Sequence, residues 1–229
     1  MDMYQKRKMR QEKKNNDNQE SFSKVSISWY PGHMLKTKKQ IIEDLKLIDV
    51  VVELLDARIP KSSRNPDIQK IVQNKKRIVL LNKSDLAEDR ETKKWIEYYK
   101  NNNVTAIACD ANLGKGIKEI LNQIEKSVEE ETQKAALKGR VKKNIRVVIL
   151  GIPNVGKSSL INRLCNKKTT IVGNKPGVTK QKQWVRIANN IELLDTPGVL
   201  WPKFEDETVA LNLAYTGSIK DEVLETIEV

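Results

Sequence analysis

Residues 146–164, RVVILGIPNVGKSSLINRL, place a glycine-rich loop between an apolar strand and a helix. Gly151, Gly156, Lys157 and Ser158 complete the pattern G-x-x-x-x-G-K-S. The two glycines let the backbone curl so that successive N–H groups point at phosphate oxygens, and the helix that follows adds the positive end of its dipole. The pattern therefore predicts a phosphate-binding loop in an α/β fold.

The residues of this loop have separate expected roles. Lys157 places a point charge at the β- and γ-phosphates, and the Ser158 hydroxyl ligates Mg²⁺. The backbone and side chains of Asn154, Val155 and Ser159 complete the expected phosphate-binding set. Because Mg²⁺ accompanies phosphate groups in such sites, we expect it as the cofactor.

The stretch LLDTPG, residues 193–198, ends a second apolar strand. Asp195 can hold Mg²⁺ through water, and the Gly198 N–H can sense a γ-phosphate. Between the two motifs lies PGVTK, residues 176–180, in which Thr179 is the candidate for a second hydroxyl ligand of Mg²⁺. An ordinary loop threonine is the alternative reading of Thr179.

The stretch RIVLLNKSDL, residues 77–86, joins a strand to the motif N-K-x-D. The Asp85 carboxylate can accept hydrogen bonds from the ring N–H and the exocyclic amine of guanine, a donor pair that adenine lacks. Asn82 and the stem of Lys83 complete the base pocket, with Ser84 between them and Asp85. Sites that hydrogen-bond their ligand reject analogues without the matching groups. GTP and GDP are therefore the expected ligands.

The stretch CDANLGKG, residues 109–116, follows the next strand. Asp110, Ala111 and Asn112 stand where a backbone N–H would cap the base carbonyl, although this signal is the least specific of the set. The base reader and this cap precede the phosphate loop, whereas ordinary GTP-binding domains have the opposite order.

Apolar runs alternate with helical patterns along most of the chain, which predicts a mainly parallel, doubly wound sheet with helices on both faces. We expect residues 127–144 to form a helical or loose connector, and residues 205–229 an amphipathic helical segment with a glycine break. The expected strands are residues 49–56, 77–81, 104–109, 145–150, 182–188 and 191–195, and the expected helices before the connector lie at about 35–45, 89–101 and 117–131.

Composition limits the partners of the chain. A net charge of +12 over 229 residues indicates a polyanionic partner such as rRNA, with simple solubility as the alternative. Residues 1–24 are basic and polar, so we expect a disordered tail, or an arm that folds on RNA. No apolar run approaches the roughly 18 residues that span a bilayer. Cys109 and Cys165 lack metal-ligand spacing and are expected to be reduced, in the cytoplasm.

These motifs in their permuted order, together with WYPGHM at residues 29–34 and DARIP at 56–60, resemble the RbgA/YlqF family of circularly permuted GTPases. The resemblance covers about residues 25–205. It implies a monomeric, cytoplasmic GTPase that acts on the large ribosomal subunit and its rRNA. Family members continue into a helical RNA-contacting domain, so we expect a tail at 1–24, a circularly permuted GTPase domain at 25–204, and the truncated beginning of the helical domain at 205–229.

Two further residues bear on hydrolysis. Val199 stands where many GTPases carry a glutamine that orients water, and the resemblance implies that His33 supplies this function, with a structural turn histidine as the alternative. In resembling GTPases that use potassium, an asparagine at the position of Asn154 ligates K⁺ beside the phosphates; an asparagine tolerated in a turn is the alternative. With Lys157, these residues form the expected catalytic set.

The permuted order preserves the sheet because the ends of a domain often lie close together. It changes the exit of the chain, since the switch around Asp195 and Gly198 leads directly into the C-terminal segment. We expect the nucleotide state to be relayed to that segment. The rival interpretation is an RNA-binding scaffold whose nucleotide site has negligible turnover. A GTPase bound to a membrane surface is disfavoured, because no amphipathic anchor or lipidation signal is present.

Overall fold

The structure, a computed structural model, describes residues 39–72, 74–139, 144–165, 183–188, 190–196 and 206–219. The expected tail at residues 1–24, His33, Thr179, Gly198 and Val199 lie outside the described residues. Asp195 is described as part of a strand, without its side chain.

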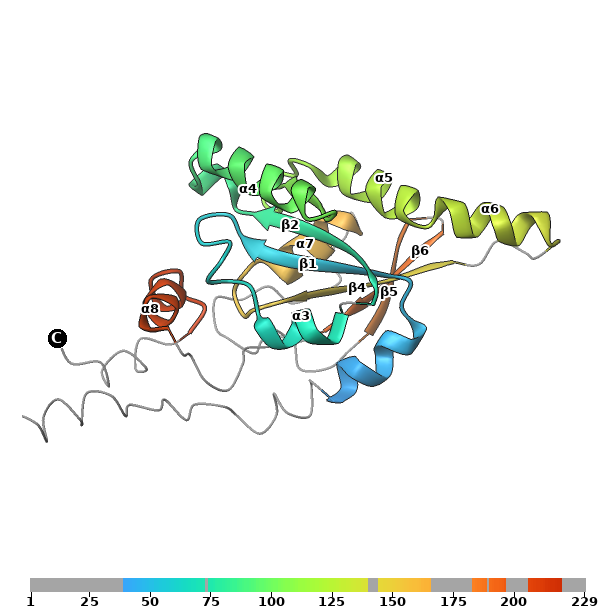
Figure 1. Ribbon diagram of the computed structural model, residues 1–229, viewed down its shortest axis with the longest axis horizontal. Helices are drawn as coiled ribbons and strands as arrows, with labels where there is room; N and C mark the ends of the chain where they lie inside the picture. The colour runs from blue at the N-terminus through green and yellow to red at the C-terminus, as the bar shows by residue number, and fades with distance from the viewer. Residues whose placement is uncertain are drawn as a thin grey trace, which may run out of the picture.

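A six-stranded sheet in the order β3-β2-β1-β4-β6-β5 forms the centre of the molecule (Figure 1). All neighbouring pairs are parallel except β5 and β6, which are antiparallel. The strand β1 pairs with β4, which carries the phosphate loop, as the sequence predicts. The mainly parallel, doubly wound sheet is therefore confirmed. The strands are β1 (Val50–Asp56), β2 (Lys76–Asn82), β3 (Thr105–Ala108), β4 (Ile145–Gly151), β5 (Gln183–Ala188) and β6 (Ile191–Asp195).

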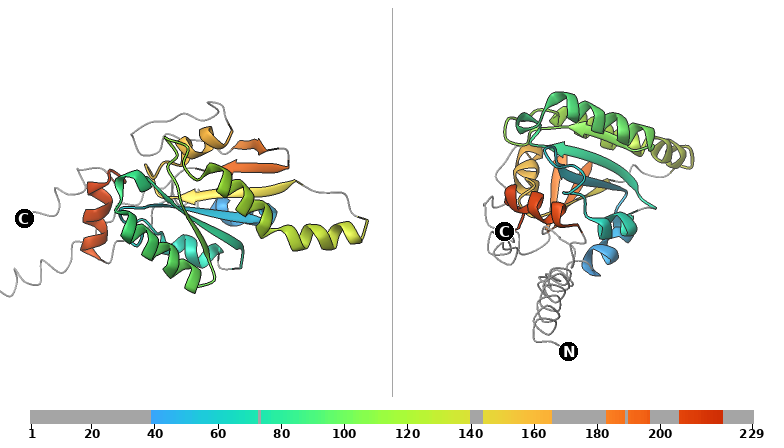
Figure 2. Two further views of the ribbon diagram at one scale, coloured as in Figure 1. Left: turned by 90° about the horizontal axis from the view of Figure 1, so that it is seen from above. Right: turned by 60° about the vertical axis from the view of Figure 1, so that its left-hand side comes forward.

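Helices cover both faces of the sheet, because alternate strand residues point to opposite sides. One face packs against the helical residues 39–47, α3 and α4, and the other packs mainly against α5 and α7. Figure 2 shows α3 and α7 on opposite sides of the strands. The helices are α3 (Pro66–Val72), α4 (Asp89–Asn101), α5 (Ile117–Ser127), α6 (Glu129–Leu137), α7 (Lys157–Leu164) and α8 (Glu207–Tyr215), with short 3₁₀ turns η1 (Leu45–Leu47) and η2 (Ser84–Leu86).

The helix α3 was not expected from the sequence. Its start carries a local signal, since the Asn65 side chain accepts hydrogen bonds from the backbone N–H groups of Asp67 and Ile68, at 2.9 and 3.3 Å. Pro66 occupies the first helical position, where a missing N–H has no consequence. Ile68 and Val72 are buried against the sheet, so tertiary packing stabilises a segment too short to be a stable helix alone.

The expected single helix over residues 117–131 is wrong. The helix α5 ends at Ser127, Val128 leaves the helical conformation, and α6 begins at Glu129. Val128 is buried in the core, whereas α6 buries none of its residues. The described part of the predicted connector is thus helical, and it extends away from the sheet (Figure 1).

The C-terminal helix α8 lies at the end of the sheet to which β1 and β2 point, opposite α6 (Figure 1). Its first turn is capped by Asp206, which accepts a hydrogen bond from the Thr208 N–H at 2.9 Å. The expected glycine break is confirmed at Gly217, whose φ is +69°. Within the described residues, no helix has the length and apolar character that a membrane crossing requires.

Candidate nucleotide-binding site

The predicted motifs meet at the carboxyl edge of the three central parallel strands. Asp56 at the end of β1 is in register with Asn82 at the end of β2, and Leu54 is in register with Gly151 at the end of β4. Ligands of open α/β sheets bind at this edge. The base reader and the phosphate loop, although reversed in sequence order, are therefore neighbours in space.

The phosphate loop leads from Gly151 into α7. A Cβ atom on Gly151 would lie 2.7 Å from the Leu54 carbonyl oxygen, so this position needs glycine for the loop to leave the strand. The Lys157 side chain is 8% exposed, and its Nζ donates to the carbonyl oxygens of Gly151 and Ile152 at 3.2 and 3.1 Å. The ammonium group is thus held inside the curl of the loop, where a phosphate would contact it.

Asn82 joins the three loops of the site. Its Nδ2 donates to the Val155 carbonyl oxygen at 2.8 Å, and its Oδ1 accepts from the Ala111 N–H at 3.0 Å. The side chain is 2% exposed. Gly156 has φ of +100°, and a Cβ atom there would lie 2.3 Å from Asn82 Nδ2. Asn82 therefore fastens the base reader to the phosphate loop and to the base cap, beyond the pocket role that the sequence suggests.

Lys83 connects the base reader to β1. Its backbone is left-handed, with φ of +60°, and its Nζ donates to the Asn154 carbonyl oxygen at 2.9 Å. The same Nζ lies 3.1 Å from Asp56 Oδ2, and Arg58 binds both carboxylate oxygens of Asp56 at 2.9 and 2.7 Å. Burial raises the pKa of Asp56, but the hydrogen bonds from Arg58 and the charge of Lys83 outweigh it and hold the pKa below its usual value.

Asp85 lies in η2 with its side chain exposed at the sheet edge. The preceding Ser84 is buried, and its N–H donates to the Cys109 carbonyl oxygen at 3.2 Å. Burial, with a smaller contribution from Asp110, raises the pKa of the Cys109 thiol to about 12. Asp85 is thus presented by a fixed turn, with its carboxylate accessible to a ligand.

The base cap differs in detail from the expected arrangement. The Asp110 side chain turns back on its own loop, where Oδ1 accepts from the N–H groups of Asn112 and Leu113 at 2.7 and 3.0 Å. The Ala111 N–H donates to Asn82, so a guanine carbonyl would compete with or share that bond. Arg163 on α7 donates to the carbonyl oxygens of Ala111 and Asn112, a contact that the sequence analysis missed because it joins distant segments.

The oxygen groups that suit Mg²⁺ lie beside the loop. Ser158 is in the first turn of α7. The end of β6 is aligned with β4, since Leu194 pairs with Val148, and the backbone of Asp195 therefore follows at the same edge. Thr196 anchors this end through a 3.0 Å hydrogen bond from its hydroxyl to the Ile149 carbonyl oxygen. Mg²⁺ usually takes one or two protein oxygens together with phosphate oxygens and water, which suits this arrangement.

The turn after α8 contacts the phosphate loop directly. Asn154, whose φ is +57°, donates from Nδ2 to the Gly217 carbonyl oxygen at 2.6 Å. Asn212 on α8 donates to the Ser62 hydroxyl at 3.0 Å, and Ile219 is buried in the same core cluster as the phosphate loop. Periodicity could not reveal these contacts, because they depend on where the chain returns after β6.

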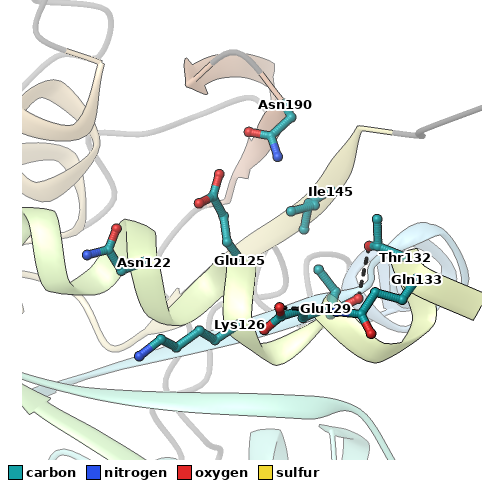
Figure 3. A pocket seen from close by; sticks show the side chains of 9 residues that line it. Asn122, Glu125, Lys126, Glu129, Thr132, Gln133, Ile145 and Asn190 are labelled. Carbon is teal, nitrogen blue, oxygen red and sulfur yellow. Dashed lines mark hydrogen bonds between the residues drawn. The ribbon is translucent and has the colours of Figure 1, made fainter. Parts of the chain in front are cut away.

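A separate hollow of about 420 Å³ lies beneath α5 and α6 (Figure 3). Glu125, Lys126 and Gln133 line it, together with Ile145 at the start of β4 and Asn190 before β6. These strand positions are at the amino edge of the sheet, away from the phosphate loop. The hollow therefore does not belong to the nucleotide-binding site.

Comparisons with known proteins agree with this geometry. A family model described as 50S ribosome-binding GTPase matches residues 146–227. "Ribosome biogenesis GTPase A" of Priestia megaterium is 55% identical over 201 residues, which cover 87% of this chain and 70% of the relative. The protein with the same name from Thermotoga maritima is 36% identical over 199 residues, covering 87% and 69%.

Two solved structures of YlqF from Thermotoga maritima are similar to this chain. The GNP-bound form has a TM-score of 0.59 at 31% sequence identity, covering 83% of this chain and 72% of the other. The GDP-bound form has a TM-score of 0.58 at 32% identity, covering 80% and 67%.

Proposed function

The chain belongs to the ribosome biogenesis GTPase A family, whose members are circularly permuted GTPases, and on this premise we propose that it is an assembly factor for the large ribosomal subunit. The observation that carries the proposal is the position of Asn82, which ties the base reader, the base cap and the phosphate loop into one site. A GTPase of this kind uses the γ-phosphate as a signal, and the ribosomal particle is the partner to which that signal would be delivered.

Guanine recognition is assigned to Asp85. Its carboxylate is exposed at the sheet edge beside Lys83, whose side chain is already fixed by Asp56 and the Asn154 carbonyl. The phosphates lie in the curl around Lys157. The remaining members of the proposed nucleotide-binding set are Ser84, Asp110, Ala111, Val155, Gly156, Ser158, Ser159, Thr179 and Gly198.

Two cations are assigned to the phosphate side of the site. Mg²⁺ is held by Ser158, by Thr179 and by Asp195 through water, and it neutralises charge on the β- and γ-phosphates. Asn154 is the proposed K⁺ ligand. The left-handed backbone of Asn154 places this residue at the rim of the loop, which supports the assignment. His33 is the proposed group that orients the attacking water, in place of Val199.

The nucleotide state is relayed to the C-terminal segment, which is proposed to contact rRNA. The switch after Asp195 leads into α8 along the chain. The described residues add a second connection, since Asn154 binds the Gly217 carbonyl and Asn212 binds Ser62. A change at the phosphate loop would therefore reach α8 from two directions.

The test is co-sedimentation of the chain with large-subunit particles in GTP, in a non-hydrolysable analogue and in GDP, together with GTP turnover with and without particles. We expect binding to depend on the nucleotide and turnover to rise when particles are added. Equal binding in all three states, with no stimulation of turnover, would contradict the assembly GTPase and favour an RNA-binding scaffold with a nucleotide sensor.

A further inference from the structure

A groove of about 660 Å³ lies on the side of the sheet that α3 and α4 cover, apart from the nucleotide site. Its walls combine three basic side chains, Lys61, Arg64 and Lys94, with the aromatic side chains of Trp95, Tyr98 and Tyr99. We propose that this groove binds one or two nucleotides of single-stranded RNA, with a base stacked on Tyr98 and the backbone phosphates against Lys61 and Arg64.

The aromatic wall is rigid and partly open to solvent. Tyr98 is 49% exposed and makes edge-to-face contacts with Trp95 and Tyr99, at ring-centroid distances of 5.5 and 5.4 Å. Tyr99 is buried in the core, and Trp95 packs against the same cluster. Because these two rings fix the helix face, Tyr98 presents its ring without an ordering cost. Bases stack on aromatic rings held in this way, and the contact tolerates any base.

The charge of the groove favours a polyanion over an apolar peptide. Glu91 is the acidic side chain in the lining, and it pairs with Lys94 at 2.6 Å. The buried Glu53 lies near Arg64 and Arg77, at 3.7 and 3.6 Å, so two guanidinium groups face one carboxylate.

Arg64 is held in place from two sides. Its guanidinium lies over the Tyr99 ring, 5.5 Å from the centroid, as well as beside Glu53. The side chain keeps 22% exposure, so a phosphate can reach a cation whose geometry is already set. Guanidinium groups recognise phosphate through paired hydrogen bonds, which suits the RNA backbone. Lys61, which is exposed, adds a mobile charge at the rim.

The groove is also connected to the nucleotide site. Residues 57–64, which carry Lys61 and Arg64, begin at Asp56, the partner of Lys83 in the base reader. The backbone N–H of Asp56 donates to the Ser63 hydroxyl at 3.1 Å, so the loop is tied to the strand end. A nucleic-acid contact at this groove is therefore placed next to the element that reads guanine.

This inference rests on the proposed function only in its choice of RNA, and binding to RNA can be measured without ribosomes. The assay is fluorescence anisotropy of the full chain with a labelled single-stranded oligouridine of about ten nucleotides, at several salt concentrations. Tyr98→Ala should weaken binding about tenfold, in line with the loss of one stacked base. Tyr98→Phe keeps the ring and should stay within about twofold of the parent.

Trp184→Ala is the matched control, because Trp184 is 44% exposed and also stacks with an arginine, Arg146, but on β5. It should bind RNA like the parent. Lys61→Gln should lower the slope of log affinity against log salt by about 0.7, the value for one phosphate of a single strand.

Unchanged RNA affinity in Tyr98→Ala would overturn the assignment, as would an equal loss in Tyr98→Ala and Trp184→Ala. In the first case, a protein or another segment of the chain would be the occupant of the groove. Circular dichroism of each variant excludes unfolding as the cause. If the oligonucleotide result holds but the chain does not bind large-subunit particles, the groove stands and the proposed ribosomal function fails.

Discussion

Replacing Asn82 by alanine should separate the loops of the nucleotide site. The side chain makes two hydrogen bonds at 2.8 and 3.0 Å, and it is almost fully buried. Each bond contributes about 1 kcal/mol, and leaving the Val155 carbonyl and the Ala111 N–H unpaired in the interior adds about 1 kcal/mol more. We therefore expect the free energy of unfolding to fall by about 3 kcal/mol. Urea denaturation without nucleotide measures this loss.

Two variants sharpen this test. Asn82→Asp keeps an acceptor for the Ala111 N–H but removes the donor to Val155, so it should weaken GTP binding while the base cap stays attached. Asn102→Ala removes an exposed hydrogen bond to the Tyr98 carbonyl and should cost no more than about 0.5 kcal/mol. If Asn82→Ala is as stable as Asn102→Ala, Asn82 does not hold the loops together, and the central observation behind the proposed function loses its force.

Three other predictions follow from the site. Asp85→Asn replaces an acceptor for the guanine donor pair, so preference should shift from GTP toward xanthosine triphosphate; unchanged preference in a competition assay would remove Asp85 from the base pocket. Asn154→Ala should abolish the difference between turnover in K⁺ and in Na⁺ at equal ionic strength, and a parent that turns over equally in both salts would refute the K⁺ assignment. Because burial raises the pKa of Cys109 to about 12, little thiolate forms at pH 8. Iodoacetamide should therefore label the partly buried Cys165 and spare Cys109 until urea is added, as mass spectrometry of the peptides can show; equal labelling of the native chain would contradict this.

The phosphate loop and the sheet were predictable because their signals are local. Gly151 and Gly156 are required by the backbone at the loop, and both positions leave no room for a Cβ atom. The β-branched runs of β1 and β4 predict buried parallel strands, which the structure confirms. The pairing of β1 with β4 followed from the family resemblance and from the fixed order of strands in this fold.

Other features escaped prediction because their causes lie far away in the sequence. The helix α3 forms where a weak local signal at Asn65 is supplemented by packing on the sheet. The break between α5 and α6 depends on the burial of Val128, which periodicity alone does not distinguish from a continuing helix. The contact of Arg163 with the base cap exists only because α7 and that loop lie side by side.

The sequence by itself determined which chemistry this chain can perform. Short motifs such as N-K-x-D and the phosphate loop prescribe donors, acceptors and backbone curvature within a few residues, so they can be read before any fold is known. Tertiary structure alone decided how these motifs act together. Asn82 bridges two loops that follow different strands, and Asn154 meets Gly217 at the far end of the chain. Hydrogen bonds of a few ångströms depend on the register of parallel strands and on the path of the connecting segments, and no local pattern of residues contains that information.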